Sequence, residues 1–169
     1  MKQTHIPYAV VTAIVMIIIG VGLYVGGLAF NSWSQYVGLV PFLIGILLNA
    51  VAFSKANDHF VTFGNVFGSG FKAIAIITII MLVWSFIAVA IFPEMITKGM
   101  EMAREGMLKK GMTDDQIDKG IEMAQSHFKL FMAMGVIFQY VFWGVIFSLV
   151  GGLIAKKKGS NPFQDAQSV

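Results

Sequence analysis

The sequence predicts an all-α integral membrane protein, with four transmembrane helices and an extramembrane antiparallel helical hairpin between spans three and four. Four stretches contain no Asp, Glu, Lys or Arg: about 6–30, 33–53, 73–92 and 130–155. Each is long enough for the roughly 20 apolar residues that a helix needs to cross the hydrocarbon core. The chain is also 57% hydrophobic and only 12% charged, whereas soluble domains are about 45–50% apolar. We therefore expect a single membrane domain over residues 1–169.

The first span, at about 6–30, begins close to Lys2 and therefore imitates a secretory signal peptide. Its apolar run exceeds the roughly 7–15 residues of a signal-peptide core, and no A-x-A-like cleavage site follows it. We expect the segment to remain as a membrane span. Gly22 and Gly26 have the GxxxG spacing that lets a second backbone approach closely. We interpret this pair as a packing site for another span of the chain, with a homodimer face as the alternative.

The second span, at about 33–53, follows a very short turn at Asn31–Ser34, so the first two spans must form an antiparallel pair. Pro41 and Gly45 within this span allow a kink, because neighbouring helices can satisfy the freed carbonyl group.

Four phenylalanines recur at three- and four-residue steps before the third span: Phe60, Phe63, Phe67 and Phe71. This spacing is typical of a helix that lies in the headgroup plane with its aromatic side toward the lipid. We expect an interfacial helix at about 58–68, with Asn57 or Asp58 in its N-cap region. Gly68–Gly70 is expected to be a flexible junction into the third span, at about 73–92.

The connector between the third and fourth spans predicts a helical hairpin at 93–129. Apolar residues recur with heptad spacing in both halves, which favours an antiparallel coiled coil. These residues are Ile96, Met100, Ala103 and Met107, followed by Ile117, Ile121, Ala124 and Phe128. Gly111 suits the position just after the first helix, and Thr113 with Gln116 predicts a capping box on the second.

No pattern predicts a catalytic, cofactor-binding or metal site. The spans hold no ionisable side chain of the Asp, Glu, Lys or Arg type, the chain has no cysteine, and His5, His59 and His127 fall in three different connectors. Neither a metal-binding spacing nor a Ser-His-Asp grouping results. Methionines along the hairpin have thioethers that can bind Cu(I), but helix packing or partner docking is the preferred interpretation. We expect a protein that is not an enzyme and needs no cofactor.

Asn49 and Gln139 are the strongest polar groups within the spans, and each must find a hydrogen-bond partner in the protein. We expect an interhelical clamp, in which they bond each other or Thr12, Thr78 or Ser85. Contact with a polar substrate or a lipid headgroup is the alternative.

Four spans place both termini on the same side of the membrane. Basic residues are equally numerous on the two sides, but the uncharged first turn and the balanced charges of the hairpin favour cytoplasmic termini in a bacterial inner membrane. Lys156–Lys158, directly after the fourth span at about 130–155, is typical of a membrane-surface anchor and not of a nucleic-acid site.

Four motifs resemble one family: TFGNVFGSGFK entering the third span, FPEM at its exit, GMTDDQI at the hairpin tip and LVGGLIAKKK closing the fourth span. They resemble, over essentially the whole chain, the Bacteroidota four-span membrane family of unknown function, domain number four-one-nine-nine. The resemblance implies a small inner-membrane protein with no catalytic residues to carry over. It also implies an association with polyprenyl-phosphate glycosyltransferases.

We expect a non-enzymatic inner-membrane scaffold or accessory subunit whose coiled-coil hairpin docks another membrane protein or a second copy of the chain. The expected docking residues are Met100, Met107, Ile117 and Ile121. The alternative is a lipid-linked carrier or small transporter component, tied to polyprenyl-phosphate sugar processing, with Asn49 and Gln139 along its path. The lack of a clear inverted repeat disfavours a transporter. The lipid bilayer is an expected partner and nucleic acid is not.

Overall fold

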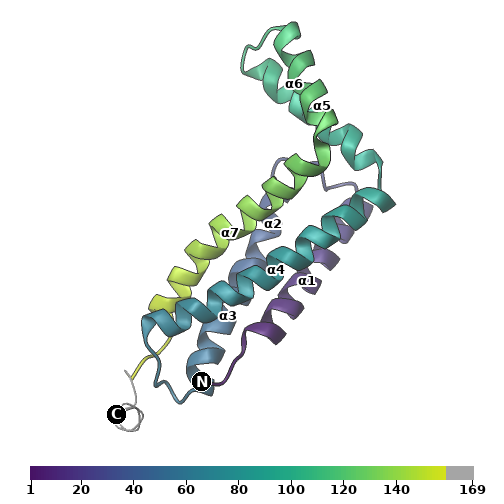
Figure 1. Ribbon diagram of the computed structural model, residues 1–169. Coiled ribbons are helices and arrows are strands. Elements are labelled where there is room, and N and C mark those ends of the chain that lie inside the picture. Colours follow the sequence, from purple (N-terminus) through teal and green to yellow (C-terminus); the bar gives the residue numbers. More distant parts are fainter. Residues whose placement is uncertain (159–169) are drawn as a thin grey trace. The chain divides into compact units, whose positions relative to one another are not determined.

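The computed structural model describes residues 1–158 and is all-helical, with no strand in this part of the chain. Its helices are α1 His5–Val25, α2 Ser34–Val37, α3 Leu39–Ala56, α4 Phe63–Ile91, α5 Glu94–Lys109, α6 Asp114–Ser126 and α7 Phe128–Ile154 (Figure 1). Of these, α1, α3, α4 and α7 are long and apolar enough to cross a membrane. The predicted all-α fold with four spans is therefore confirmed. The part of the expected 1–169 domain from Gly159 onward lies outside the described residues.

The described chain divides into two compact units. Unit 1 is Met1–Met81 with Gln139–Val169, and unit 2 is Leu82–Phe138. The division has a physical reason: the apolar spans pack with one another, whereas the amphipathic helices α5 and α6 pack with each other.

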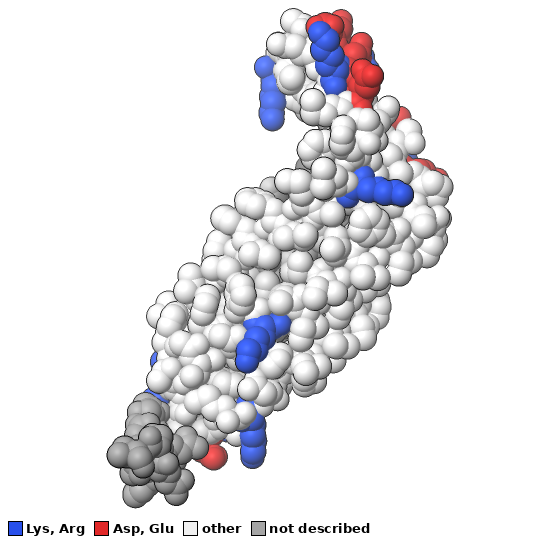
Figure 2. Space-filling view, viewed as in Figure 1, with Lys and Arg blue, Asp and Glu red and all other residues white. Residues whose placement is uncertain are grey.

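Unit 1 is built from α1, α3 and its segments of α4 and α7, which run alongside one another (Figure 1). Phe42 of α3 meets Tyr140 and Phe147 of α7 edge-on, with ring centroids 5.5 and 5.4 Å apart. Aromatic pairs favour this arrangement. On the face shown in Figure 2, the surface over the spans is almost free of charge, and acidic side chains gather over α5 and α6. An uncharged belt is what contact with lipid tails requires.

Close approaches between helices in unit 1 depend on glycine. A Cβ at Gly144 of α7 would lie 2.7 Å from Ile74 of α4, and one at Gly151 would lie 2.9 Å from Ala50 of α3. Such small residues let membrane helices gain van der Waals contact. Gly22 differs, because a Cβ there would meet nothing within 4 Å. The interpretation of Gly22 and Gly26 as an intrachain packing site is therefore wrong.

The second span is divided at Gly38, which separates α2 from α3. Pro41 lies in the first turn of α3, where a missing N–H removes no helical hydrogen bond, and no kink follows from it. Gly45 serves packing instead, because an added Cβ would overlap Thr12 of α1.

The separate interfacial helix expected at 58–68 is absent. α3 ends at Ala56, and α4 begins at Phe63 and continues without a break through Gly68–Gly70 to Ile91. Glycine lowers helix stability by only about 1 kcal/mol. Packing of Gly70 on α7, where an added Cβ would overlap Ser148, offsets that loss.

The N-cap of α4 is Thr62 and not Asn57 or Asp58. The N–H of Asn65 donates to Thr62 Oγ1 at 3.2 Å, and the N–H of Thr62 donates to Asn65 Oδ1 at 3.0 Å. Asn57 instead follows the last residue of α3, where its side chain donates to the Phe53 carbonyl at 2.8 Å.

In unit 2, α5 and α6 pack against each other around the turn at 110–113. Gly111 has a φ of +74°, the left-handed conformation that favours glycine. Thr113 and Gln116 form the predicted capping box, in which the Thr113 N–H donates to Gln116 Oε1 at 3.0 Å. Across the pair, Arg104 Nη1 lies 3.1 Å from Asp118 Oδ1. The predicted turn chemistry is therefore confirmed.

Candidate functional site

The end of unit 1 that holds the N-terminus is closed by hydrogen bonds between segments far apart in the sequence. The Lys2 N–H donates to Asn57 Oδ1 at 2.8 Å, and Asn57 Nδ2 donates to the Lys2 carbonyl at 3.1 Å. The Lys158 N–H donates to the His59 carbonyl at 2.7 Å. These bonds hold the turn between α3 and α4 to the segment before α1 and the segment after α7.

Asn49 links three helices near this end. Thr4 Oγ1, at the N-cap of α1, donates to Asn49 Oδ1 at 2.8 Å, and Asn49 Nδ2 donates to Ser69 Oγ of α4 at 3.3 Å. Asn49 is fully buried and Ser69 is 3% exposed. Asn49 therefore does act as an interhelical clamp, but its partners are Thr4 and Ser69 and not the residues expected.

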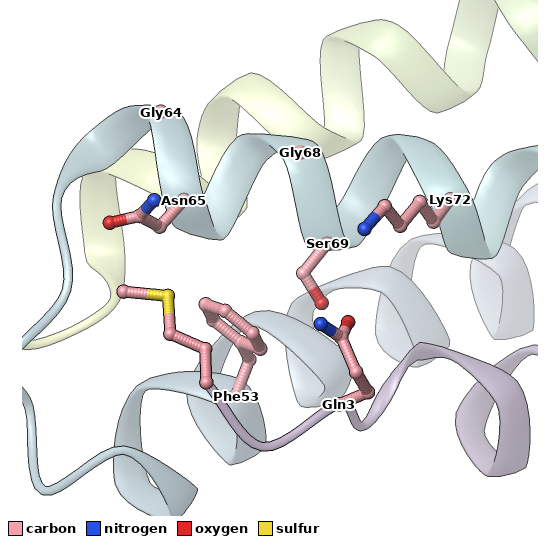
Figure 3. A pocket seen from close by; sticks show the side chains of 8 residues that line it. Gln3, Phe53, Gly64, Asn65, Gly68, Ser69 and Lys72 are labelled. Atoms are coloured by element: carbon pink, nitrogen blue, oxygen red, sulfur yellow. The ribbon is translucent and has the colours of Figure 1, made fainter.

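A pocket of about 200 Å³ lies beside this clamp. We call it the terminal pocket; it is lined by Met1, Gln3, Phe53, Gly64, Asn65, Gly68, Ser69 and Lys72. Figure 3 shows the polar ends of Gln3, Ser69 and Lys72 on the same side of the Phe53 ring, with Gln3 and Ser69 close together. Of these lining residues, all within the described range, Lys72 alone has a charged side chain. Among side chains, the pocket therefore combines polar groups with a single charge, which is positive.

Lys72 lies directly before the charge-free part of α4. α4 has 29 residues, and its charge-free part, 73–91, covers about 28 Å at 1.5 Å per residue. That length almost fills the roughly 30 Å hydrocarbon core. Residues 63–72, several of which line the pocket, precede this apolar length.

Gln139 lies elsewhere in unit 1. It lines a second pocket, of about 160 Å³, together with Gly20 of α1, Ser34 of α2 and Met81 of α4. Thr4 and Gly20 are about 24 Å apart along α1 at 1.5 Å per residue, so Asn49 and Gln139 do not meet. Two of the three hydroxyls expected as their partners bond within their own helix: Thr78 donates to the Ile74 carbonyl and Ser85 to the Leu82 carbonyl.

The structure separates the four expected docking residues into two sets. Ile117 is fully buried, and Met107 packs on Gly120, where an added Cβ would lie 3.2 Å from the methionine Cε. These two residues hold α5 to α6. Met100 and Ile121 instead line an open hollow of about 330 Å³, which we call the α5–α6 groove.

The α5–α6 groove shows how the expected coiled-coil seam departs from its heptad pattern. The seam is closed only near the turn, where Ile117 is buried, and no residue of α5 is buried. Farther from the turn, an open groove lies between the two helices. It is lined by Ile96, Thr97, Met100, Glu101, Arg104, Ile121 and Gln125. Apolar positions at heptad spacing therefore lie open along the pair.

Within the described residues, no grouping of three or more His, Cys, Asp or Glu side chains could hold a metal ion. The clamp at Asn49 was expected from the sequence, but its partners Thr4 and Ser69 were not, because these bonds join residues 45 and 20 positions apart. Lys72 did carry a signal, since it is the last charged residue before the third apolar run. Such a lysine marks the boundary of the hydrocarbon core.

No curated protein and no solved structure matches this chain. A family described as a protein of unknown function (DUF4199) matches residues 7–157. The match begins inside α1 and ends just after α7, and it includes the clamp residues Asn49 and Ser69, Lys72 and the whole α5–α6 pair. The chain therefore belongs to the DUF4199 family of proteins of unknown function.

Proposed function

We propose that this protein is a non-enzymatic accessory subunit of a bacterial inner membrane, and that its α5–α6 groove holds a helix of a partner membrane protein. The observation that carries the proposal is the exposure of the apolar side chains of two amphipathic helices. Among the described residues of α5 and α6, Ile117 alone is buried. Met123 is 59% exposed and Leu108 is 50% exposed. Amphipathic helices normally bury their apolar face, so this pair offers a surface for a partner.

The chemistry of the groove suits a helix. Its apolar lining comes from Ile96, Met100 and Ile121, and Glu101 and Arg104 lie beside them. Helix-in-groove recognition uses such an apolar floor with polar groups at the rim. Methionine adds a flexible side chain that adapts to a partner surface.

The polar groups of the spans support an accessory role over a carrier. A carrier path would use Asn49 and Gln139 together. Asn49 is fully buried and already bonded to Thr4 and Ser69, whereas Gln139 lines a different pocket. The amide of Asn49 therefore serves the packing of the spans.

Purification of the full-length chain from its native membrane in a mild detergent, followed by native mass spectrometry, tests the proposal. The wild type should carry a second protein at a fixed stoichiometry. Met100→Asp and Ile121→Asp should each release that protein, because a carboxylate in the apolar groove cannot be desolvated without a partner. Met102→Asp is the matched control, since Met102 is exposed and does not line the groove.

Circular dichroism of each variant verifies that its helices remain. Retention of the second protein by both groove variants, with the helices intact, would contradict the docking proposal. A bound mass equal to that of the chain itself would identify a second copy as the occupant.

A further inference from the structure

We propose that the terminal pocket binds a phosphate group, supplied by the headgroup of an anionic lipid. This site lies in unit 1 and is independent of the docking role proposed for the α5–α6 groove. Three observations carry it: the direction of the hydrogen bonds at the pocket wall, the lysine in a lining without acidic residues, and the position of the pocket next to the charge-free part of α4.

Hydrogen bonds at the wall direct a donor into the pocket. With the Asn49 amide oriented as it is in the structure, Oδ1 accepts from Thr4 and Nδ2 donates to Ser69 Oγ. The Ser69 oxygen is thus used as an acceptor, and among the described residues its hydroxyl hydrogen has no acceptor. Ser69 lines the pocket and is 3% exposed. A ligand that supplies only acceptor oxygens completes this chain of bonds.

The charge of the pocket selects an anion. Lys72 extends its ammonium group beside Ser69 and Gln3 in Figure 3, and none of the lining residues is acidic. Lysine binds phosphate as a point charge, and charge-assisted hydrogen bonds are about twice as strong as neutral ones. Gly64 lies in the first turn of α4, whose N-terminal end carries a partial positive charge.

The size and depth of the pocket select a headgroup. About 200 Å³ is less than the roughly 300–1,000 Å³ of sites that enclose drug-sized ligands, so the phosphate group fits and the acyl chains remain outside. The 63–72 segment of α4 extends beyond the apolar 73–91 segment. Lipid phosphates occupy the same layer, next to the hydrocarbon core.

Glycine keeps the pocket open and provides the variant that tests it. Gly68 lines the pocket, and a Cβ added there would meet nothing within 4 Å, so a larger side chain has room at the pocket wall. Gly68→Leu should therefore fill the site and leave the helices in place. Gly68→Ala is the milder form of the same change.

Native mass spectrometry of the full-length protein in an uncharged detergent, titrated with phosphatidylglycerol or phosphatidylcholine, measures the binding. The wild type should retain one phosphatidylglycerol in preference to phosphatidylcholine. Lys72→Gln should weaken that binding about tenfold or more, because it removes a charge-assisted contact. Gly68→Leu should abolish it. Lys55→Gln is the matched control, because Lys55 lies in the last turn of α3 and does not line the pocket; its effect should stay within about twofold.

Inorganic phosphate added as a competitor separates the two sources of the ligand. Retention of the lipid in millimolar phosphate supports headgroup binding, whereas displacement would assign the pocket to free phosphate and overturn the lipid source. Equal binding by wild type, Lys72→Gln and Gly68→Leu would overturn the site itself. An equal loss in Lys55→Gln would also overturn it, because general surface attraction would then explain the binding.

Discussion

Asn49 shows how one polar side chain is accommodated within a membrane span. An amide in hydrocarbon needs partners in the protein, and here both ends of the amide have one, on α1 and on α4. The clamp ties three helices at the same depth. The hydrogen bond that Asn49 Nδ2 donates to Ser69 Oγ also holds the Ser69 hydroxyl at the wall of the terminal pocket.

Asn49→Ala should destabilise unit 1 by about 1–2 kcal/mol, because Thr4 and the buried Ser69 lose their shared partner. Unfolding of the detergent-solubilised protein, followed by circular dichroism, measures the change. Ser85→Ala is the control, since the Ser85 hydroxyl bonds only a carbonyl of its own helix. Equal stability of Asn49→Ala and wild type would show that the clamp does not hold the helices.

Gly144 and Gly135 form a matched pair on α7. A Cβ at Gly144 would lie 2.7 Å from Ile74, whereas one at Gly135 would meet nothing within 4 Å. Gly144→Ala should therefore destabilise the protein by about 1–3 kcal/mol through overpacking. Gly135→Ala should be neutral or stabilise it by up to about 1 kcal/mol, because alanine favours the helix. The same unfolding measurement applies, and a reversed order of the two variants would contradict the packing described for α7.

Among the elements, α4 and the α5–α6 turn show opposite limits of what the sequence can predict. The turn was predictable because all its signals are local: Gly111, the capping box and the acidic first turn of α6 lie within a few residues. α4 was not, because its continuity through Gly68–Gly70 depends on Gly70 packing against Ser148. No local pattern reports a contact with a residue so far along the chain.

Thr113→Ala should remove the cap of α6 and cost about 1 kcal/mol. The effect belongs to this element, so amide hydrogen exchange at 114–117 should become faster while exchange in the spans stays unchanged. Thr97→Ala is the control, because Thr97 lies inside α5 and caps no helix. Unchanged exchange at the tip of the Thr113→Ala variant would contradict the role of the capping box.

At the scale of the whole molecule, the number of spans followed from composition, since charge-free stretches of sufficient length have few other structures available. The division into two units and the positions of the pockets did not follow. The terminal pocket is lined by Met1, Phe53 and Lys72, which only the folded chain brings together. Asn49 has hydrogen-bond partners on two other helices, as expected, but its position apart from Gln139 depends on helix register, which composition does not encode.

We propose a four-span topology in which the connector between the third and fourth spans faces the outside of the inner membrane and the connector between the second and third spans faces the cytoplasm. The chain has no cysteine, so single cysteines at Gln116, in the capping box, and at Lys55, near the terminal pocket, can be labelled in intact cells with an impermeant maleimide. We expect Gln116→Cys to be labelled from outside the inner membrane, and Lys55→Cys to be labelled only after the membrane is opened. Labelling of both positions from the same side would contradict the four-span arrangement. Labelling of Lys55→Cys from outside, with Gln116→Cys labelled only after the membrane is opened, would contradict the proposed orientation.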